Sequence, residues 1–383
     1  MPSVKESPTH TNLAISPILT DTVWVTPHWR TRGLQGTVVA VAAAAMLILP
    51  TPVVHADVPA RVTGTSTIAT GLTSPWGLAF LPDGSALVSE RDTGLIKRIR
   101  PGSIPVVRKV GQVPGVTPFG EGGLLGIAVP PGPDPRWVYA YFTSATDNRI
   151  VRMPWDGRRL GEPRVILGGI PRGVHHNGGR LVFGPDGMLY ASTGDTTNDT
   201  FSQDLRSLGG KVLRLTPTGG RPKDNPFPRS LVWTLGHRNV QGLAFDARGR
   251  LYATEFGQKT VDELNLLKPG RNYGWPIYEG AAHQKGFVDP VAQWTPTAIA
   301  SPSGVAIAGS SAYVATLAGQ RLYRVPLTGP RAGLPSVVPL GDLGRLRTVM
   351  TAPDGSLWLI TSNTDGRGQV REGDDRILRL TLS

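Results

Sequence analysis

Cysteine is absent from this 383-residue chain, which excludes disulfides, thiolate metal sites, thioether-bound haem and a cysteine-linked lipid. Histidine is scarce: there are seven, and His10, His28 and His55 precede residue 56. No Gly-x-Gly-x-x-Gly run follows a strand and opens a helix, so a nicotinamide cofactor is not supported. A long amphipathic helical pattern is also missing, which disfavours an α/β fold.

The composition is that of a globular protein, with 39% hydrophobic and 18% charged residues. Glycine (48) and proline (35) are abundant, which is typical of a chain with many tight turns. The net charge is +12, but lysine and arginine are scattered and do not alternate with aromatics. We therefore expect a solvated basic surface and no nucleic-acid partner.

The N-terminal segment has the pattern of a secretory signal. Arg30 and Arg32 precede the apolar run 37–49, which is short for a membrane span, and Val54-His55-Ala56 is a small-x-small cleavage pattern. We expect residues 1–56 to be a signal peptide with an extended N-region, cleaved after Ala56. An uncleaved membrane anchor is the alternative. Residues 57–383 would then form a single secreted domain, in the cell envelope or outside it, without stable membrane insertion.

A repeated hairpin unit runs through residues 57–383. It joins an apolar residue, a turn and a strand-like run, and the turn contains Asp-Gly in three of its four clear copies: 80–89, 183–192 and 351–361, with 245–254 as the fourth. Glycine adopts the positive φ of such turns without steric cost. Weaker copies lie at 127–142 and 307–316.

An alternating strand follows each hairpin, at 94–100, 148–155, 210–216, 262–270, 320–327 and 375–382. Six hairpins with six partner strands, spaced by roughly 40–60 residues, predict an all-β fold, a six-bladed β-propeller of four-stranded antiparallel blades. We expect the last strand, ending at Leu382, to pair with 62–69 in the sheet of the first blade and so close the ring.

Three polar motifs stand out, and two of them contain histidine. They are HHNGGRL at 175–181, STGD at 192–195 and LGHRN at 235–239, and they contain three of the four histidines after residue 56. Histidine is suited to proton transfer near neutral pH. Each motif lies beside a predicted strand, where the loops of several propeller blades converge at one end of the central channel.

The wider motifs resemble those of a known family. They include GLTSPWGLAFLPDG (71–84), HHNGGRLVFGPDG (175–187), LGHRNVQGLAF (235–245), DELNLLKPGRNYGWP (262–276) and GRLR (344–347). Together they resemble the glucose/sorbosone dehydrogenase family, soluble aldose dehydrogenases that use pyrroloquinoline quinone (PQQ) and form six-bladed propellers. The resemblance implies oxidation of a sugar's anomeric C1 hydroxyl to a lactone by hydride transfer to the quinone. It also implies an external electron acceptor and a monomer or homodimer.

The resemblance assigns the chemistry to His176, Asp195 and Arg238. His176 would be the general base, and Asp195 would hold its other ring nitrogen. Arg238 and Asn239 would contact the quinone, with Arg238 stabilising negative charge on its oxygen. The alternatives are a structural polar pair for His176 and Asp195, and an inter-blade tie for Arg238.

Other cofactor contacts are expected from Arg345, Arg347 and Glu121. The two arginines alternate on a strand, point to one face, and suit a cofactor with three carboxylates. Glu121 replaces a glutamine of well-known members, so it adds negative charge unless it pairs with an arginine or stays protonated. Ala318 stands where a lysine grips the cofactor in those members, and Gln258 replaces a proline.

The resemblance also implies Ca²⁺, a cation that prefers oxygen ligands. Asp262, Glu263 and the Tyr273 region resemble a structural calcium site, while main-chain oxygens of Gly257 and Gln258 match the quinone-bound calcium. A capped or salt-bridged turn is the alternative for Asp262 and Glu263.

A non-redox propeller is the competing function. A calcium-dependent lactone hydrolase would need carboxylates that converge on one metal, for which Glu121, Asp195 and Glu255 are the candidates. A cell-envelope carbohydrate-binding module would need none of the His–Asp–Arg set.

Overall fold

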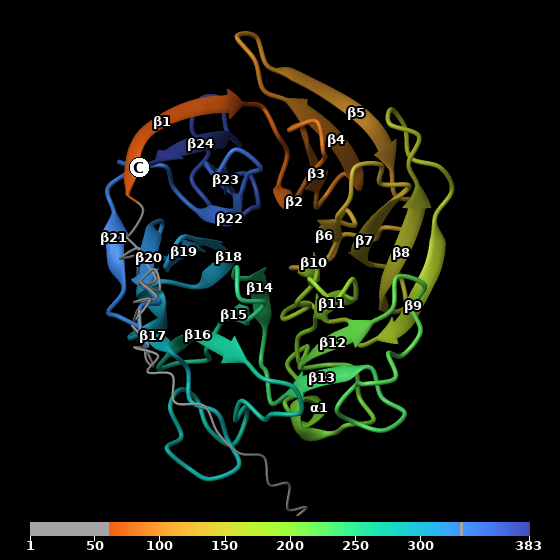
Figure 1. Ribbon diagram of the computed structural model, residues 1–383, viewed down its shortest axis with the longest axis vertical. Coiled ribbons are helices and arrows are strands. Elements are labelled where there is room, and N and C mark those ends of the chain that lie inside the picture. The colour runs from red at the N-terminus through yellow and green to blue at the C-terminus, as the bar shows by residue number, and fades with distance from the viewer. Residues whose placement is uncertain (1–60, 330–331) are drawn as a thin grey trace, which may run out of the picture. The chain divides into compact units, whose positions relative to one another are not determined.

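The computed structural model describes residues 61–329 and 332–383, and these form a ring of six four-stranded antiparallel sheets (Figure 1). The predicted all-β, six-bladed propeller is confirmed. The predicted signal peptide, residues 1–56, lies outside the described residues. Within them the helices are one α-helical turn, α1 (Thr200–Gln203), and a 3₁₀ turn (Thr297–Ile299). None of the described helices has the length and apolarity needed to cross a membrane.

Each blade is built from strands that follow one another in the chain, with one exception. Blade one holds β2 (Pro75–Phe80), β3 (Ala86–Glu90), β4 (Leu95–Arg100) and β5 (Val106–Gln112). Blade two holds β6 (Leu124–Ala128), β7 (Trp137–Thr143), β8 (Asn148–Pro154) and β9 (Arg164–Ile170). Blade three holds β10 (Leu181–Phe183), β11 (Leu189–Ser192), β12 (Lys211–Leu215) and β13 (Val232–Leu235). Blade four holds β14 (Val240–Phe245), β15 (Leu251–Glu255), β16 (Asp262–Leu267) and β17 (Ala292–Trp294). Blade five holds β18 (Pro302–Ala308), β19 (Ser311–Thr316), β20 (Leu322–Pro326) and β21 (Ser336–Val338).

The sixth blade is the exception, because it combines both ends of the described chain. β22 (Leu346–Thr351), β23 (Leu357–Thr361) and β24 (Ile377–Leu382) are completed by β1 (Val62–Ala69), which pairs antiparallel with β24. The predicted pairing that closes the ring is confirmed. Its predicted place was wrong: the pair belongs to the sheet of the last blade and not of the first, because β2–β5 already form a complete four-stranded first blade and the last blade has only three strands of its own.

The repeated hairpins form the two innermost strands of the blades. Their turns use glycine with positive φ, as at Gly84 (77°), Gly187 (72°) and Gly355 (81°). All six predicted hairpins and all six partner strands are present. The hydrophobic core lies between the sheets: Leu87 and Ile96 of blade one, for example, pack in one cluster with residues of blade two.

A corresponding position on the innermost strands sets how closely the blades approach. Four blades have glycine there: Gly77, Gly126, Gly242 and Gly304. A Cβ on Gly77 would lie 2.8 Å from the main-chain oxygen of Leu125 in the next blade. The remaining two blades carry Arg180 and Thr348, whose side chains hydrogen-bond carbonyl oxygens of the next blade, Gln241 (2.9 Å) and Trp76 (2.7 Å).

Candidate active site

The motifs HHNGGRL, STGD and LGHRN meet at the end of the blades opposite the hairpin turns. Strands β10 and β11 are antiparallel, so the loop before β10 and the loop after β11 lie at the same end. The main-chain amide of Asp195 donates to the carbonyl oxygen of Arg238 over 2.8 Å, which joins blade three to blade four. The predicted convergence of HHNGGRL, STGD and LGHRN is therefore observed.

His176 is held through one ring nitrogen. Its Nδ1 lies 2.7 Å from Asp195 Oδ1, and its backbone has a φ of 55°. Asp195 is buried; its Oδ1 accepts the Thr197 amide (2.8 Å) and its Oδ2 accepts the Trp275 indole N–H (2.8 Å). An ionised carboxylate can only accept, so Nδ1 carries the hydrogen and the Nε2 lone pair is left free.

Glu121 supports the main chain of His176. One carboxylate oxygen accepts the His176 amide over 3.0 Å, and the other accepts Arg367 Nη1 over 2.8 Å. His175 Nδ1 lies 3.4 Å from Glu121 Oε1. Burial opposes ionisation of Glu121, but the His176 amide and Arg367 hold its pKa below the usual value. Glu121 is thus an ionised, arginine-paired group, the first of the two arrangements considered from the sequence.

Arg238 is a half-buried cation without a carboxylate partner among the described residues. Its Nη1 donates to the carbonyl oxygens of Gly257 (2.6 Å) and Phe256 (3.3 Å), and its backbone amide donates to Glu255. The guanidinium lies 5.5 Å from the centre of the Trp275 ring. Burial lowers the pKa of Arg238. The neighbouring Asn239 accepts the Gly178 amide over 3.1 Å.

Arg345 and Arg347 share one carboxylate. Asp365 Oδ2 lies 3.2 Å from Arg345 Nη2 and 3.5 Å from Arg347 Nη2. Arg347 Nη1 donates to Gln241 Oε1 over 3.0 Å. Burial opposes the ionisation of Asp365, but Arg347 and Arg345 hold its pKa below the usual value.

The donor set fits an anionic, oxygen-rich cofactor. Arg238 Nε, Asn239 Nδ2 and Arg347 Nε are buried and have no hydrogen-bond partner. Buried polar groups without partners are rare and need an explanation. These three N–H groups belong to three of the five residues predicted to contact the quinone, and all three are donors suited to carboxylate or quinone oxygens.

The predicted calcium ligands are divided among separate contacts. Asp262 accepts the amides of Gly257 (2.9 Å) and Ser301 (2.7 Å), whereas Glu263, the next residue on β16, accepts the amide of Gly280 (2.7 Å). Successive strand residues face opposite sides, so the two carboxylates do not meet.

The other predicted ligands are also engaged. The Tyr273 hydroxyl donates to the Leu266 carbonyl oxygen over 2.8 Å, the Gln258 amide donates to Glu279 Oε1 over 2.7 Å, and the Gly257 oxygen accepts Arg238 Nη1. In residues 61–329 and 332–383, no three or more His, Asp or Glu side chains are grouped to hold a metal ion. The two expected calcium sites, one at Asp262, Glu263 and Tyr273 and one at the main-chain oxygens of Gly257 and Gln258, therefore stay predictions.

Glu263 instead lies opposite Glu255 on the paired strands β15 and β16. Burial and the charge of Glu255 raise the pKa of Glu263. Glu255 accepts His237 Nδ1 over 2.8 Å, and Glu263 accepts the side-chain amide of Asn265 over 2.8 Å. Asn265 Oδ1 is buried without a partner. Two facing carboxylates and a free amide oxygen form a set of hard oxygen ligands.

The sequence interpretation missed four residues of this site. The Trp275 indole donates to Asp195, and the Gln241 side chain accepts from Arg347. Asp365 pairs with both Arg345 and Arg347, and Arg367 pairs with Glu121. Trp275 and Gln241 belonged to the NYGWP and LGHRNVQGLAF motifs, so their place beside the site residues was a usable signal. Asp365 and Arg367 lie in the loop between β23 and β24 and had no comparable motif.

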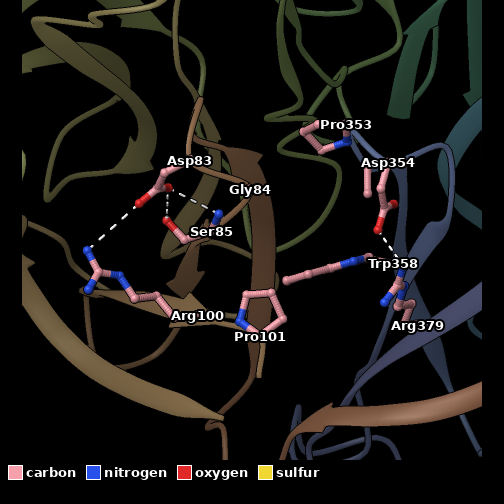
Figure 2. Close-up of a pocket in the computed structure, with 10 residues that line it drawn as sticks. Asp83, Gly84, Ser85, Arg100, Pro101, Pro353, Asp354, Trp358 and Arg379 are labelled. Carbon is pink, nitrogen blue, oxygen red and sulfur yellow. Dashed lines mark hydrogen bonds and ion pairs between the residues drawn. The ribbon is translucent and has the colours of Figure 1, made fainter. Parts of the chain in front are cut away.

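A groove of about 400 Å³ between blades one and six is not part of this site (Figure 2). It lies at the hairpin turns, and Figure 2 shows Asp83 and Asp354 in contact with Arg100 and Arg379. A similar ion pair, Asp186 with Arg214, ties the turn of blade three to its third strand. The charges of this groove thus follow a structural pattern of the blades.

The carboxylates required by the hydrolase alternative are held by histidines and an arginine. Glu121 and Asp195 both accept from His176, through its main-chain amide and its Nδ1, and Glu121 also accepts from Arg367, while Glu255 accepts His237 Nδ1. Among the described residues they belong to no group of three or more His, Asp or Glu side chains that could hold a metal ion.

Comparisons with known proteins agree with this arrangement. Residues 72–378 match the family model described as glucose/sorbosone dehydrogenase. A structure described as the PQQ-bound form of aldose sugar dehydrogenase from Streptomyces coelicolor is 55% identical, with a TM-score of 0.80 over 85% of this chain and 98% of that one.

Two curated proteins are also similar. Quinoprotein glucose dehydrogenase B of Acinetobacter calcoaceticus is 35% identical over 57% of this chain and 54% of its own length. Aldose sugar dehydrogenase YliI of Escherichia coli strain K12 is 28% identical over 77% of this chain and 89% of its own length.

Proposed function

Because this chain belongs to the glucose/sorbosone dehydrogenase family, we propose that it is a secreted, PQQ-dependent aldose dehydrogenase. It would oxidise the anomeric C1 hydroxyl of a sugar to a lactone and pass the electrons to an external acceptor. The observation that carries the proposal is the contact between His176 Nδ1 and Asp195, because it leaves Nε2 free to take a proton.

His176 has the role of general base. Oxidation of an alcohol by hydride loss leaves the hydroxyl proton, and this proton needs an acceptor within hydrogen-bond reach. Nε2 supplies it, while ionised Asp195 stabilises the imidazolium that results. Trp275 and the Thr197 amide hold the Asp195 carboxylate, so the ring orientation is set before substrate arrives.

Arg238, Asn239, Arg345 and Arg347 would hold the cofactor. Their support is the set of unpartnered N–H groups on three of these residues. When bound, PQQ supplies a two-electron acceptor for the hydride. Arg238, which has no carboxylate partner among the described residues, stabilises negative charge on a neighbouring oxygen in a site where burial strengthens the interaction.

A structural calcium site is part of the proposal, at Glu255, Glu263 and Asn265. The facing carboxylates repel one another, and a divalent cation between them would relieve that repulsion. Chelation with EDTA should lower the melting temperature, and Ca²⁺ should restore it better than Mg²⁺. Glu263→Gln should remove the calcium response, whereas Glu279→Gln, which changes a carboxylate bound to main-chain amides, should keep it. An unchanged melting curve after exhaustive chelation would remove this site.

Secretion follows from the N-terminal pattern of Arg30, Arg32 and the apolar run 37–49. The test is to express the whole chain in a secreting bacterial host and determine the N-terminus of the protein recovered outside the cytoplasm. We expect the mature chain to begin at Asp57. A product that begins at residue 1 and stays with the membranes would support the anchor instead.

The decisive experiment for the activity is reconstitution. Purified protein without cofactor is mixed with PQQ and Ca²⁺, and reduction of a soluble dye is followed with a panel of aldoses. We expect dye reduction only when protein, quinone and sugar are all present. Quinone binding without dye reduction by any aldose would contradict an aldose dehydrogenase, and an absence of quinone binding would contradict the cofactor.

A further inference from the structure

Arg180 crosses the centre of the propeller. It precedes β10 in blade three and is 4% exposed. Its Nε donates to the Gln241 carbonyl oxygen in blade four over 2.9 Å, and its Nη2 donates to Thr348 Oγ1 in blade six over 2.9 Å. Blades three and six face each other across the ring (Figure 1), so this side chain reaches from the start of blade three to the innermost strand of blade six.

A second buried arginine lies beside it. The guanidinium carbons of Arg180 and Arg347 are 4.2 Å and 5.8 Å from the centre of the same Trp76 ring. Arg347 is 6% exposed. Two buried cations therefore share one buried indole, and little water is available to screen them.

The positive charge here exceeds the negative charge. Among the described residues Arg180 has no carboxylate partner, and Arg347 has only Asp365 at 3.5 Å, which Arg345 shares at 3.2 Å. Burial and the neighbouring cation lower the pKa of Arg180 to about 9, and burial lowers that of Arg347 to about 10. Both remain charged at neutral pH, and a buried charge is costly unless it is paired.

Two hydrogen-bond donors of this pair are unused. Arg180 Nη1 donates to no atom of the described residues, and Arg347 Nε is buried without a partner. Since both residues are almost fully buried, an ion that reaches these donors has to be small and weakly hydrated. A dianion such as sulfate would need more donors and more space.

We propose that Arg180 and Arg347, packed on Trp76, form a binding site for one small monovalent anion of the halide class where the innermost strands of blades one, three and six approach one another. The ion supplies the missing negative charge and ties blades one, three and six together. Arg347 is also one of the proposed quinone contacts, so the ion occupies this site in the protein without quinone. The inference goes beyond the proposed function, and its test needs no quinone.

The test measures thermal stability against halide concentration. Protein is made in a host that produces no PQQ, and sodium methanesulfonate is exchanged for sodium bromide at constant ionic strength. The melting temperature should rise with bromide concentration, since a ligand that binds only the folded state stabilises it. Arg180→Met should need at least about tenfold more bromide for the same rise. Arg206→Met, which removes a 92% exposed arginine side chain, should respond as the wild type does.

Anomalous scattering from crystals of the wild-type protein grown in sodium bromide gives a second measurement that does not depend on whether Arg180→Met folds. A bromide peak between Arg180 Nη1 and Arg347 Nε is the expected result. A bromide-dependent rise in melting temperature that persists unchanged in Arg180→Met would overturn the proposal. So would the lack of such a peak, even if bromide is bound elsewhere.

Discussion

His176 Nδ1 and Asp195 Oδ1 lie 2.7 Å apart, and this contact decides which nitrogen of the imidazole can act as a base. His176→Gln should lower kcat by on the order of 10²–10⁴-fold, since it removes the proton acceptor. Quinone affinity and thermal unfolding should stay close to those of the wild type. Steady-state kinetics with a fully reconstituted enzyme checks this, and a variant that keeps most of the wild-type rate would rule out His176 as the base.

Asp195→Asn tests the orientation of the ring. Both oxygens of Asp195 accept N–H groups: Oδ1 accepts the Thr197 amide and Oδ2 accepts the Trp275 indole. The side-chain NH₂ of asparagine would replace one of these oxygens, so in either orientation it would face one of these donors. If the NH₂ faces His176, it favours the tautomer with the hydrogen on Nε2. We expect kcat to fall by on the order of 10²-fold or more. Wild-type kcat and an unchanged pH profile would show that Asp195 does not orient the base.

Arg238→Ala should weaken quinone binding and slow the chemical step. A hydrogen bond to a charged group contributes about 1.5–3 kcal/mol, which corresponds to roughly tenfold or more in affinity. Ala318→Lys should act in the opposite direction if, as the family resemblance implies, the exposed Ala318 stands where a lysine would grip the cofactor. Calorimetric titration with PQQ measures both. If Arg238→Ala binds as tightly as the wild type and Ala318→Lys binds no more tightly, the channel does not hold the quinone in the proposed way.

Lys211 predicts a pH dependence of stability. It is fully buried beside the STGD segment, and its Nζ donates to the carbonyl oxygens of Gly209 (2.7 Å) and Phe201. Burial lowers the pKa of Lys211 to about 7. Between about pH 7 and 10.5 the unfolded chain therefore binds a proton that the folded chain lacks, so the free energy of unfolding rises with pH.

Below pH 7 the lysine is charged in both states, and the full cost of burying the charge is present. Lys211→Met should remove this part of the slope, which amounts to at most about 1.4 kcal/mol per pH unit. Urea unfolding at several values between pH 6 and 10 gives the comparison. Identical slopes for wild type and variant would contradict a depressed pKa.

Gly77→Ala tests the close approach of blades one and two. The new Cβ would lie 2.7 Å from Ser89 Oγ and 2.8 Å from two main-chain atoms of blade two, so the blades would have to separate. We expect a loss of about 1–3 kcal/mol in unfolding free energy. Gly64→Ala is the matched control, because its Cβ would meet only the Thr381 side chain, with Oγ1 at 3.8 Å and Cβ at 3.9 Å, which are ordinary contacts. Equal stabilities of the two variants would show that this glycine does not set the blade spacing.

Local patterns in the sequence were enough to determine the propeller. Alternation of apolar and polar residues has the two-residue period of a half-buried strand, and glycine turns such as Asp83-Gly84 reverse the chain. Both signals lie within a few residues of each other. Their sixfold repetition fixed the number of blades, and the pairing of β1 with β24 followed from the need to close the ring.

The divided calcium ligands show what such patterns leave out. Asp262 and Glu263 are neighbours in sequence, and their types suggested a shared ion. On a strand they face opposite sides, so Glu263 meets Glu255 across the sheet while Asp262 binds the main chain of Gly257.

The motifs located His176, Asp195 and Arg238, but the partners of these residues and of the channel arginines were decided by the ring. Arg367 reaches Glu121 across 246 residues of sequence, and Arg180 reaches Thr348 across 168. No local signal links such pairs, because their separation in space depends on how six sheets pack around a common axis. The sequence by itself determined the blades and the reactive side chains at their ends. Only the tertiary structure decided which charges are paired and which remain without a partner.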